Sequence, residues 1–285
     1  VILITTKRGG SGLNVEYSSN YSVQTIAKRP EMLSNRELMQ ETNNYLYEEY
    51  LIRYKAYPYG TRQVSTLPTF RPRYSDTDIS SAIQGTDWYG LITQTGRINQ
   101  HNVSINKGKD DTKIMFSLNY FDQKGVIKTS GLQRISGRLN LDQKLSSWFD
   151  YGISLTGSVI ENQNAALGGG ENENSGIIQS ALQYSPNIKP VKDENGEYLL
   201  NPSQALIPNP LSFLDINDNT TEKRWLSNAF ANIHFDKYST LKFSAGMDDQ
   251  RAIRKTYLPK TFMYGKGQNG VASINNINKV DYMTE

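Results

Sequence analysis

Seven stretches of the chain alternate between apolar and polar residues with a period of two, and this pattern constrains the fold more than any other feature. Successive side chains of a β-strand point to opposite faces, so the spacing predicts strands with one apolar and one polar face. In the first stretch, Leu13 and Val15 share one face, whereas Asn14 and Glu16 share the other. The other stretches lie near 100–106, 114–120, 134–141, 149–159, 225–235 and 241–248.

The charged residues of these stretches all fall on one side. The apolar faces contain no Asp, Glu, Lys or Arg, whereas the opposite faces carry Glu16, Arg134, Arg138, Asp150, Lys242 and Asp248. An Arg or Lys that faces lipid at the bilayer midplane costs about 2–4 kcal/mol, so strands that face lipid should lack such charges. The inner faces of a soluble β-sandwich would lack them as well, and the alternation alone leaves both folds open.

The connections between the stretches distinguish the two folds better. Long connections at about 25–97, 122–131 and 161–223 alternate with short ones at 107–112, 142–148 and 236–240. In an antiparallel meander, every second connection lies on the same side, so one side has long loops and the other has short turns. Outer-membrane barrels show this asymmetry. We therefore predict an all-β fold, an antiparallel transmembrane β-barrel with long extracellular loops. No apolar run of the chain is long enough for a membrane helix.

The long loops carry local structure and aromatic side chains. Ser34 and Glu37 form the pattern of a capping box, which predicts a helix from about 35 to 55. Residues 193–196 indicate a tight hairpin, and the glycines at 168–170 a mobile segment. Exposed aromatic rings can stack on sugar rings or pack on peptide side chains. We take as candidate ligand- or partner-binding residues Tyr57, Tyr59, Trp88 and Tyr89. The alternative is that such residues hold the loop together.

Composition and motifs favour no catalytic or metal chemistry. The net charge of +3 is small and dispersed, so we expect no nucleic-acid partner. The chain has no cysteine, and its two histidines, His101 and His234, have no partner at ligand spacing, so we expect no metal site and no cofactor. Acidic pairs such as Asp110 and Asp111 fall at predicted turns or strand ends, which does not suit a glycosidase. We expect no catalytic residues and no enzyme.

Several motifs resemble the SusC/RagA family of TonB-dependent outer-membrane importers. The first nine residues are similar to the end of the family's plug domain. Further similar motifs occur at Thr86–Trp88, Asn99–Ser104, Phe116–Tyr120, Asp122–Ile127 and Arg138–Asp142. These motifs cover about residues 1–160, and beyond them the resemblance is one of layout.

The resemblance implies a barrel of roughly 22 strands with a plugged lumen. Residues 1–10 would be the last plug strand, and 11–285 the first seven or eight barrel strands of a fragment, in the outer membrane of a Bacteroidota-type Gram-negative cell. The implied partners are a SusD-like surface lipoprotein, the TonB–ExbB–ExbD complex acting through parts absent here, and outer-membrane lipid. The implied ligands are oligosaccharides, or peptides in some members, and transporter–lipoprotein pairs can form a dimer. A soluble or surface-anchored all-β glycan-binding module is the alternative.

Overall fold

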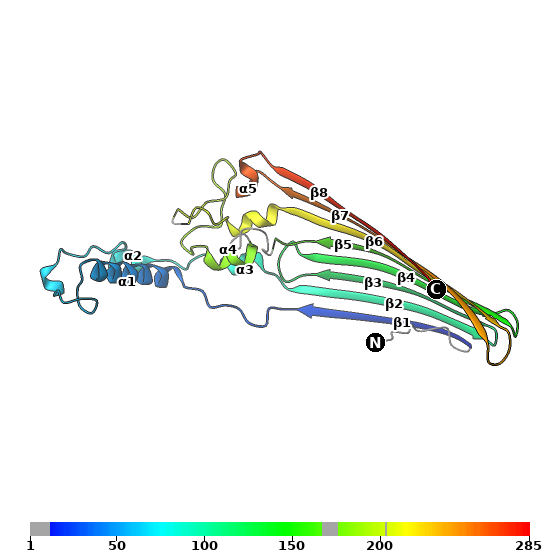
Figure 1. The fold of residues 1–285 in the computed structure, drawn as a ribbon. Helices are drawn as coiled ribbons and strands as arrows, with labels where there is room; N and C mark the ends of the chain where they lie inside the picture. Colours follow the sequence, from blue (N-terminus) through cyan, green and yellow to red (C-terminus); the bar gives the residue numbers. More distant parts are fainter. Residues whose placement is uncertain (1–11, 167–175, 203) are drawn as a thin grey trace. The chain divides into compact units, whose positions relative to one another are not determined.

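The computed structural model describes residues 12–166, 176–202 and 204–285, and an eight-stranded antiparallel sheet dominates it (Figure 1). The strands neighbour one another in chain order: β1 (Gly12–Gln24), β2 (Gly96–Lys109), β3 (Thr112–Lys124), β4 (Gly131–Lys144), β5 (Phe149–Gln163), β6 (Asn217–His234), β7 (Thr240–Leu258) and β8 (Val271–Thr284). The predicted all-β fold is confirmed. The predicted plug strand at 1–10 and the glycines at 168–170 lie outside the described residues.

The register of the sheet places the apolar residues of neighbouring strands opposite one another. One such row across five strands consists of Val15, Ile105, Phe116, Leu139 and Leu155. The adjacent row, on the other face, consists of Asn14, Asn106, Met115, Asn140 and Ser154. Because directly opposite residues point to the same side of a sheet, the two rows confirm the predicted apolar and polar faces.

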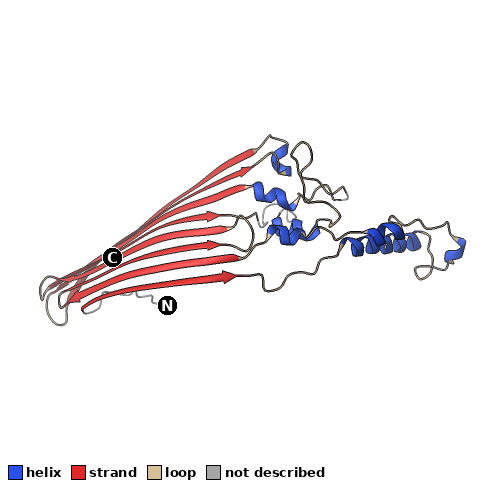
Figure 2. Ribbon diagram, turned by 180° about the vertical axis from the view of Figure 1, so that it is seen from behind, coloured by secondary structure: helices blue, strands red, loops and turns tan. Residues whose placement is uncertain are grey.

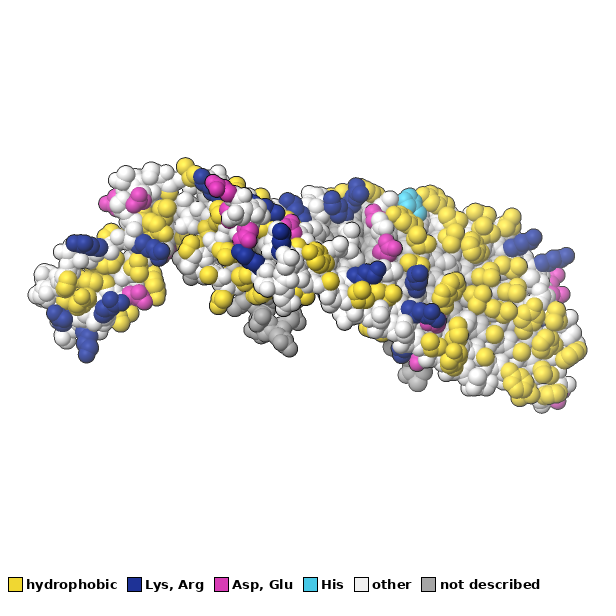
Figure 3. Space-filling model, turned by 90° about the horizontal axis from the view of Figure 1, so that it is seen from above, with side chains coloured by type: hydrophobic (Ala, Val, Ile, Leu, Met, Phe, Trp, Pro, Cys, Tyr) yellow, Lys and Arg dark blue, Asp and Glu magenta, His cyan; other side chains and the backbone are white. Residues whose placement is uncertain are grey.

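The apolar face is exposed along the sheet. Leu118, in the middle of β3, is 47% exposed, and Tyr21 of β1 is 65% exposed. Figure 3 shows hydrophobic side chains gathered over the strand region at the right of the view. In the described part of the chain, all named strands belong to one sheet, so no second sheet covers this face. The packed double layer of a β-sandwich, in which both apolar faces are buried, is therefore not what these residues form.

Most strands are longer than the sequence pattern predicts, among them β6 and β7. β6 begins eight residues before Trp225, and β7 continues to Leu258 rather than to 248. The added part of β6 is polar on both faces, and that of β7 mixes charged residues with Ile253, Tyr257 and Leu258, so neither shows a regular alternation of hydrophobicity. Ion pairs cross between them instead: the Arg224 guanidinium lies 2.5 Å from Asp248, and that of Arg254 lies 2.5 Å from Asp218. The second long connection is accordingly shorter than predicted and runs over 164–216.

The connections differ in length on the two sides of the sheet. Short turns at 110–111, 145–148 and 235–239 lie at one end of the strands, the right end in Figure 1. The other connections occupy 25–95, 125–130, 164–216 and 259–270. The connections at 25–95 and 164–216 agree with the predicted asymmetry, whereas the connection predicted as long at 122–131 has only the six residues 125–130, because β3 and β4 extend further than the sequence pattern shows.

The helices fall in the connections (Figure 2). They are α1 (Asn35–Arg53), α2 (Asp76–Ser81), α3 (Trp88–Ile92), α4 (Ile177–Gln183), α5 (Met263–Lys266) and two 3₁₀ turns, η1 (Val64–Thr66) and η2 (Pro210–Asp215). The predicted first helix is confirmed as α1, and its capping box between Ser34 and Glu37 is formed. The predicted hairpin is confirmed by the bridge between Lys192 and Tyr198, with Gly196 at φ 76°. No described helix combines the length and hydropathy needed to span a bilayer.

Candidate functional site

The two long loops fold together as one compact unit, which comprises 27–92 and 167–213 and which we call the loop unit. Trp88 lies at its centre and is only 2% exposed. Its indole Nε1 donates a hydrogen bond to the Ser185 carbonyl at 2.9 Å, and its ring packs edge-on against Tyr184, with 4.8 Å between the centroids. A residue of the first loop is thus buried among residues of the second.

Further hydrogen bonds join the same two segments. The backbone N–H of Thr86 donates to Pro186 at 2.8 Å, and the Thr86 hydroxyl donates to the Ile188 carbonyl at 2.6 Å. The Tyr184 hydroxyl donates to the Leu199 carbonyl at 2.6 Å, and burial raises the pKa of Tyr184 to about 12. We call this set of contacts around Trp88 the Trp88 junction.

The four aromatic candidates lie in different environments. Tyr57 is 76% exposed and Tyr59 is 49% exposed, so both rings are available to a ligand or partner. Tyr89 is half-buried, and the guanidinium of Arg29 lies 5.7 Å from its ring centroid. Trp88 has no free face in this structure, so any influence it has on a ligand would act through the shape of the loop unit. A role of these four residues in binding stays a prediction.

An ion pair at the start of α3 orders the segment around Trp88. The guanidinium of Arg29 contacts the carboxylate of Asp87, which also accepts a hydrogen bond from the Gly90 backbone N–H at 2.9 Å. Partial burial raises the pKa of Asp87, but the hydrogen bonds from Arg29 and Gly90 outweigh burial and hold this pKa below its ordinary value. The carboxylate therefore stays charged at neutral pH and fixes the turn into α3.

A groove of about 590 Å³ lies within the loop unit. Its walls combine aliphatic side chains of both loops with hydroxyl, amide and guanidinium groups; the residues include Leu33, Leu38, Thr42, Arg73, Leu182 and Asn187. Small-molecule sites have this mixture of an apolar lining and a few polar groups that set orientation. The groove could therefore take a sugar ring or a peptide side chain.

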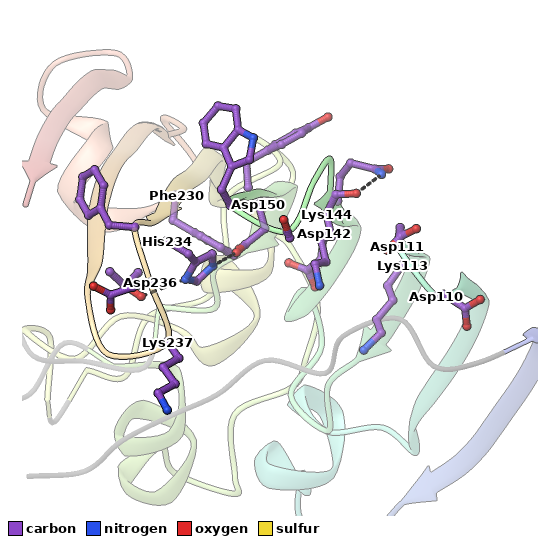
Figure 4. Close-up of a pocket in the computed structure, with 16 residues that line it drawn as sticks. Asp110, Asp111, Lys113, Asp142, Lys144, Asp150, Phe230, His234, Asp236 and Lys237 are labelled. Atoms are coloured by element: carbon purple, nitrogen blue, oxygen red, sulfur yellow. Dashed lines mark hydrogen bonds and ion pairs between the residues drawn. The ribbon is translucent and has the colours of Figure 1, made fainter.

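A larger cavity of about 1000 Å³ lies on the sheet beside the short turns (Figure 4). His234 Nε2 lies 2.6 Å from Asp150 Oδ1, and His234 Nδ1 lies 2.9 Å from the Thr240 hydroxyl. Three lysines and four further aspartates also line it: Lys113, Lys144, Lys237, Asp110, Asp111, Asp142 and Asp236. Across the described ranges, no three potential metal ligands lie together. These charges suit contact with a polar protein segment.

The sequence pattern identified Trp88 but not what it would contact. Tyr184 and Ser185 are nearly 100 residues away along the chain, and no local pattern marks them. The polarity of the second loop gave no sign that part of it would be buried.

Comparison with known proteins places the chain among bacterial receptors. No protein-family model matches it. It is 28% identical to TonB-dependent receptor P26 of Formosa agariphila, across 100% of this chain and 27% of the receptor. It is 26% identical to TonB-dependent receptor SusC of Bacteroides thetaiotaomicron, across 95% of this chain and 26% of the receptor. The chain thus spans about a quarter of the length of the curated relatives it matches.

Solved structures agree on the fold. The structure of the RagAB peptide transporter superposes with a TM-score of 0.69 at 19% identity, over 98% of this chain and 33% of the transporter. The open-open state of the RagAB peptide importer gives a TM-score of 0.68 at 18% identity, over 98% and 32%. The relatives are receptors and transporters, not enzymes. The chain is therefore similar in sequence to SusC-like TonB-dependent receptors, and its sheet has the fold of part of the RagAB transporter structures.

Proposed function

We propose that this chain contributes the first strands and the outer loops of an importer that carries oligosaccharides across the outer membrane. The two-faced sheet is the observation that carries the proposal. Across β1 to β5, one face of the sheet carries exposed apolar side chains, which would meet hydrocarbon, and the other carries polar side chains, which would line a lumen. An importer needs this combination because its wall must dissolve in lipid while its interior passes a hydrated cargo.

Peptides are the second candidate cargo. The RagAB relatives are named a peptide transporter and a peptide importer, and their fold matches over nearly the whole chain. The groove of the loop unit does not favour either cargo, because both sugar rings and peptide side chains suit its mixed lining. Transport of either cargo requires no covalent chemistry from this chain.

We assign partners to the loop unit and to the sheet. A SusD-like lipoprotein would close over the loop unit, where Tyr89 offers an aromatic contact that Trp88 supports, whereas Tyr57 and Tyr59 would face the ligand. Residues 1–10 would be the end of a plug within the barrel formed by 11–285, and TonB–ExbB–ExbD would act on that plug. The charged cavity beside the short turns offers a polar surface for such a plug.

Uptake by cells tests the proposal. The gene of the protein that contains this chain is deleted and restored, and uptake of fluorescent oligosaccharides and of peptides is measured in both strains. The restored gene should return uptake of at least one oligosaccharide, and affinity purification should recover a surface lipoprotein. If the protein fractionates as a soluble monomer and uptake never depends on it, the glycan-binding module becomes the better explanation. Dependence for peptides alone would replace the first cargo with the second.

A further inference from the structure

One segment of the loop unit is basic and aromatic and contains no acidic residue. Between 50 and 75, the chain has five cationic side chains and no Asp or Glu. The five are Arg53, Lys55, Arg62, Arg71 and Arg73, and all are exposed. We call this segment the basic tip. The net charge of the whole chain is only +3, because acidic residues elsewhere offset the positive charge of the basic tip.

The cations of the basic tip lack carboxylate partners, in contrast to three arginines of the β6–β7 pair. Arg224, Arg251 and Arg254 of the β6–β7 pair each lie within 3 Å of an aspartate. Within the described ranges, no ion pair involves any of the five cations of the tip. Their charges are therefore available to an external anion.

An aromatic cluster holds the tip in one conformation. Phe70 packs against Tyr47 and Tyr50 of α1, with centroid distances of 5.1 and 5.5 Å. The Tyr50 hydroxyl donates to the Pro68 carbonyl at 2.5 Å, and Asn43 Oδ1 accepts the backbone N–H groups of Arg73 and Tyr74. These contacts bind the returning segment to α1, so a ligand would not have to order it.

A closed turn brings exposed rings and cations together. The Arg62 N–H donates to the Lys55 carbonyl at 3.2 Å, and the Tyr57 N–H donates to the Arg62 carbonyl at 3.1 Å. Tyr57 and Tyr59, the two most accessible aromatic candidates, lie on this turn between the two cations. Aromatic faces pack on the C–H faces of sugar rings, and Lys and Arg pair with carboxylates or sulfates.

We propose that the basic tip binds an acidic oligosaccharide that carries a carboxylate or sulfate group on its sugar rings. This inference rests on the proposed import of oligosaccharides and narrows the cargo to an anionic class. Such a ligand presents a flat C–H face and a negative charge on the same unit, which matches a turn with both exposed tyrosines and unpaired cations. A stable protein partner would instead need an extended interface, whereas the exposed tyrosines and the two cations share one short turn of the chain.

Binding to the purified full-length receptor in detergent tests the inference. The probes are oligogalacturonate, its methyl ester, and a sulfated carrageenan oligosaccharide; the ester keeps the rings and removes the charge. The test variant is Lys55→Gln with Arg62→Gln. The matched control is Lys28→Gln with Lys189→Gln, which removes the same charge from exposed positions of the loop unit outside the tip.

The test variant should weaken binding of at least one anionic probe about tenfold, because it removes two exposed ion pairs. The control should change it less than about twofold, and 300 mM salt should reduce the difference between the two variants. The methyl ester should bind weakly and equally to all proteins. Which anionic probe responds tells carboxylate from sulfate.

Three results would overturn the inference. Equal losses of probe binding in the test and control variants would show that binding depends on the overall charge of the loop unit and not on the basic tip. Loss of lipoprotein recovery without loss of probe binding would make the tip a protein contact. A receptor that imports neutral oligosaccharides or peptides but binds no anionic probe would refute the inference while the proposed import stands. Absence of any dependent uptake would instead refute the proposed function.

Discussion

A single charge on the apolar face of the sheet should destabilise the receptor, whereas the same charge on the inner face should not. Leu118 is the middle residue of β3 and lies opposite Val103 and Gly137 on the exposed apolar face. Leu118→Arg places a guanidinium in hydrocarbon near the bilayer midplane, at a cost of about 2–4 kcal/mol. The folded-to-unfolded ratio should therefore fall about 30- to 1000-fold.

The matched control is Ser104→Arg, beside Val103 in β2 but on the inner face. Its position lies opposite Glu16, so the new guanidinium faces a carboxylate across the strands. Full-length receptor refolded into lipid vesicles is titrated with urea, and the folded fraction is read from the heat-dependent shift of the barrel band on gels. Leu118→Arg as stable as the wild type, or Ser104→Arg equally unstable, would refute the assignment of the two faces.

Three further predictions concern the loops and the β6–β7 extension. Trp88→Ala should destabilise the loop unit by about 3–5 kcal/mol and expose 167–213 to limited proteolysis, whereas Trp88→Phe should lose only about 1 kcal/mol with the indole hydrogen bond. The backbone N–H of Ser34 donates to the Glu37 carboxylate and lowers the pKa of Glu37 below its ordinary value of 4.5, so this part of the capping box contributes fully above pH 4.5 and is lost as the pH falls through the lowered pKa; the difference in hydrogen exchange at the start of α1 between wild type and Glu37→Ala should shrink on that descent. Arg224→Gln should speed hydrogen exchange in the extension of β6, residues 217–224, by no more than about fivefold, because exposed ion pairs contribute at most about 1 kcal/mol.

Each of these has a clear contrary result. Unchanged proteolysis in Trp88→Ala would mean that the loop unit does not depend on the Trp88 junction. A difference between wild type and Glu37→Ala that stays constant as the pH falls below 4.5 would show that the cap does not depend on the Glu37 charge. Faster exchange along the whole of β6 in Arg224→Gln would place the effect outside the extension.

The sequence predicted the part of the fold that touches lipid because hydrocarbon imposes a rule on every second residue. Leu118 and Val103 obey that rule, and β3 and β2 were found through it. The extensions of β6 (217–224) and β7 (249–258) obey no such rule, since the first is polar on both faces and the second mixes charged with apolar residues, and cross-strand pairs such as Arg254 with Asp218 join them. Ion pairs between segments that are distant in sequence impose no hydrophobic periodicity on either segment.

β8 escaped the pattern for a different reason. Its aliphatic residues recur every third position, at Val271, Ile274, Ile277 and Val280, so they fall on alternating faces of the strand. A search for a period of two finds nothing there. In the loops, helix α1 was predicted because a capping box is local, whereas the burial of Trp88 depends on Tyr184, which the sequence could not connect to it.

The Trp88 junction has a consequence for exchanging parts between receptors. Because residues of the second loop bury the Trp88 indole of the first loop, neither loop forms a complete core by itself. The first loop grafted alone onto a different barrel would expose the Trp88 side chain to solvent. The second loop grafted alone would have a cavity where the Trp88 ring packs. An engineered transfer of ligand selectivity should therefore move 27–92 and 167–213 together. Natural substitutions at Trp88 and at its contacts in the second loop should likewise occur together.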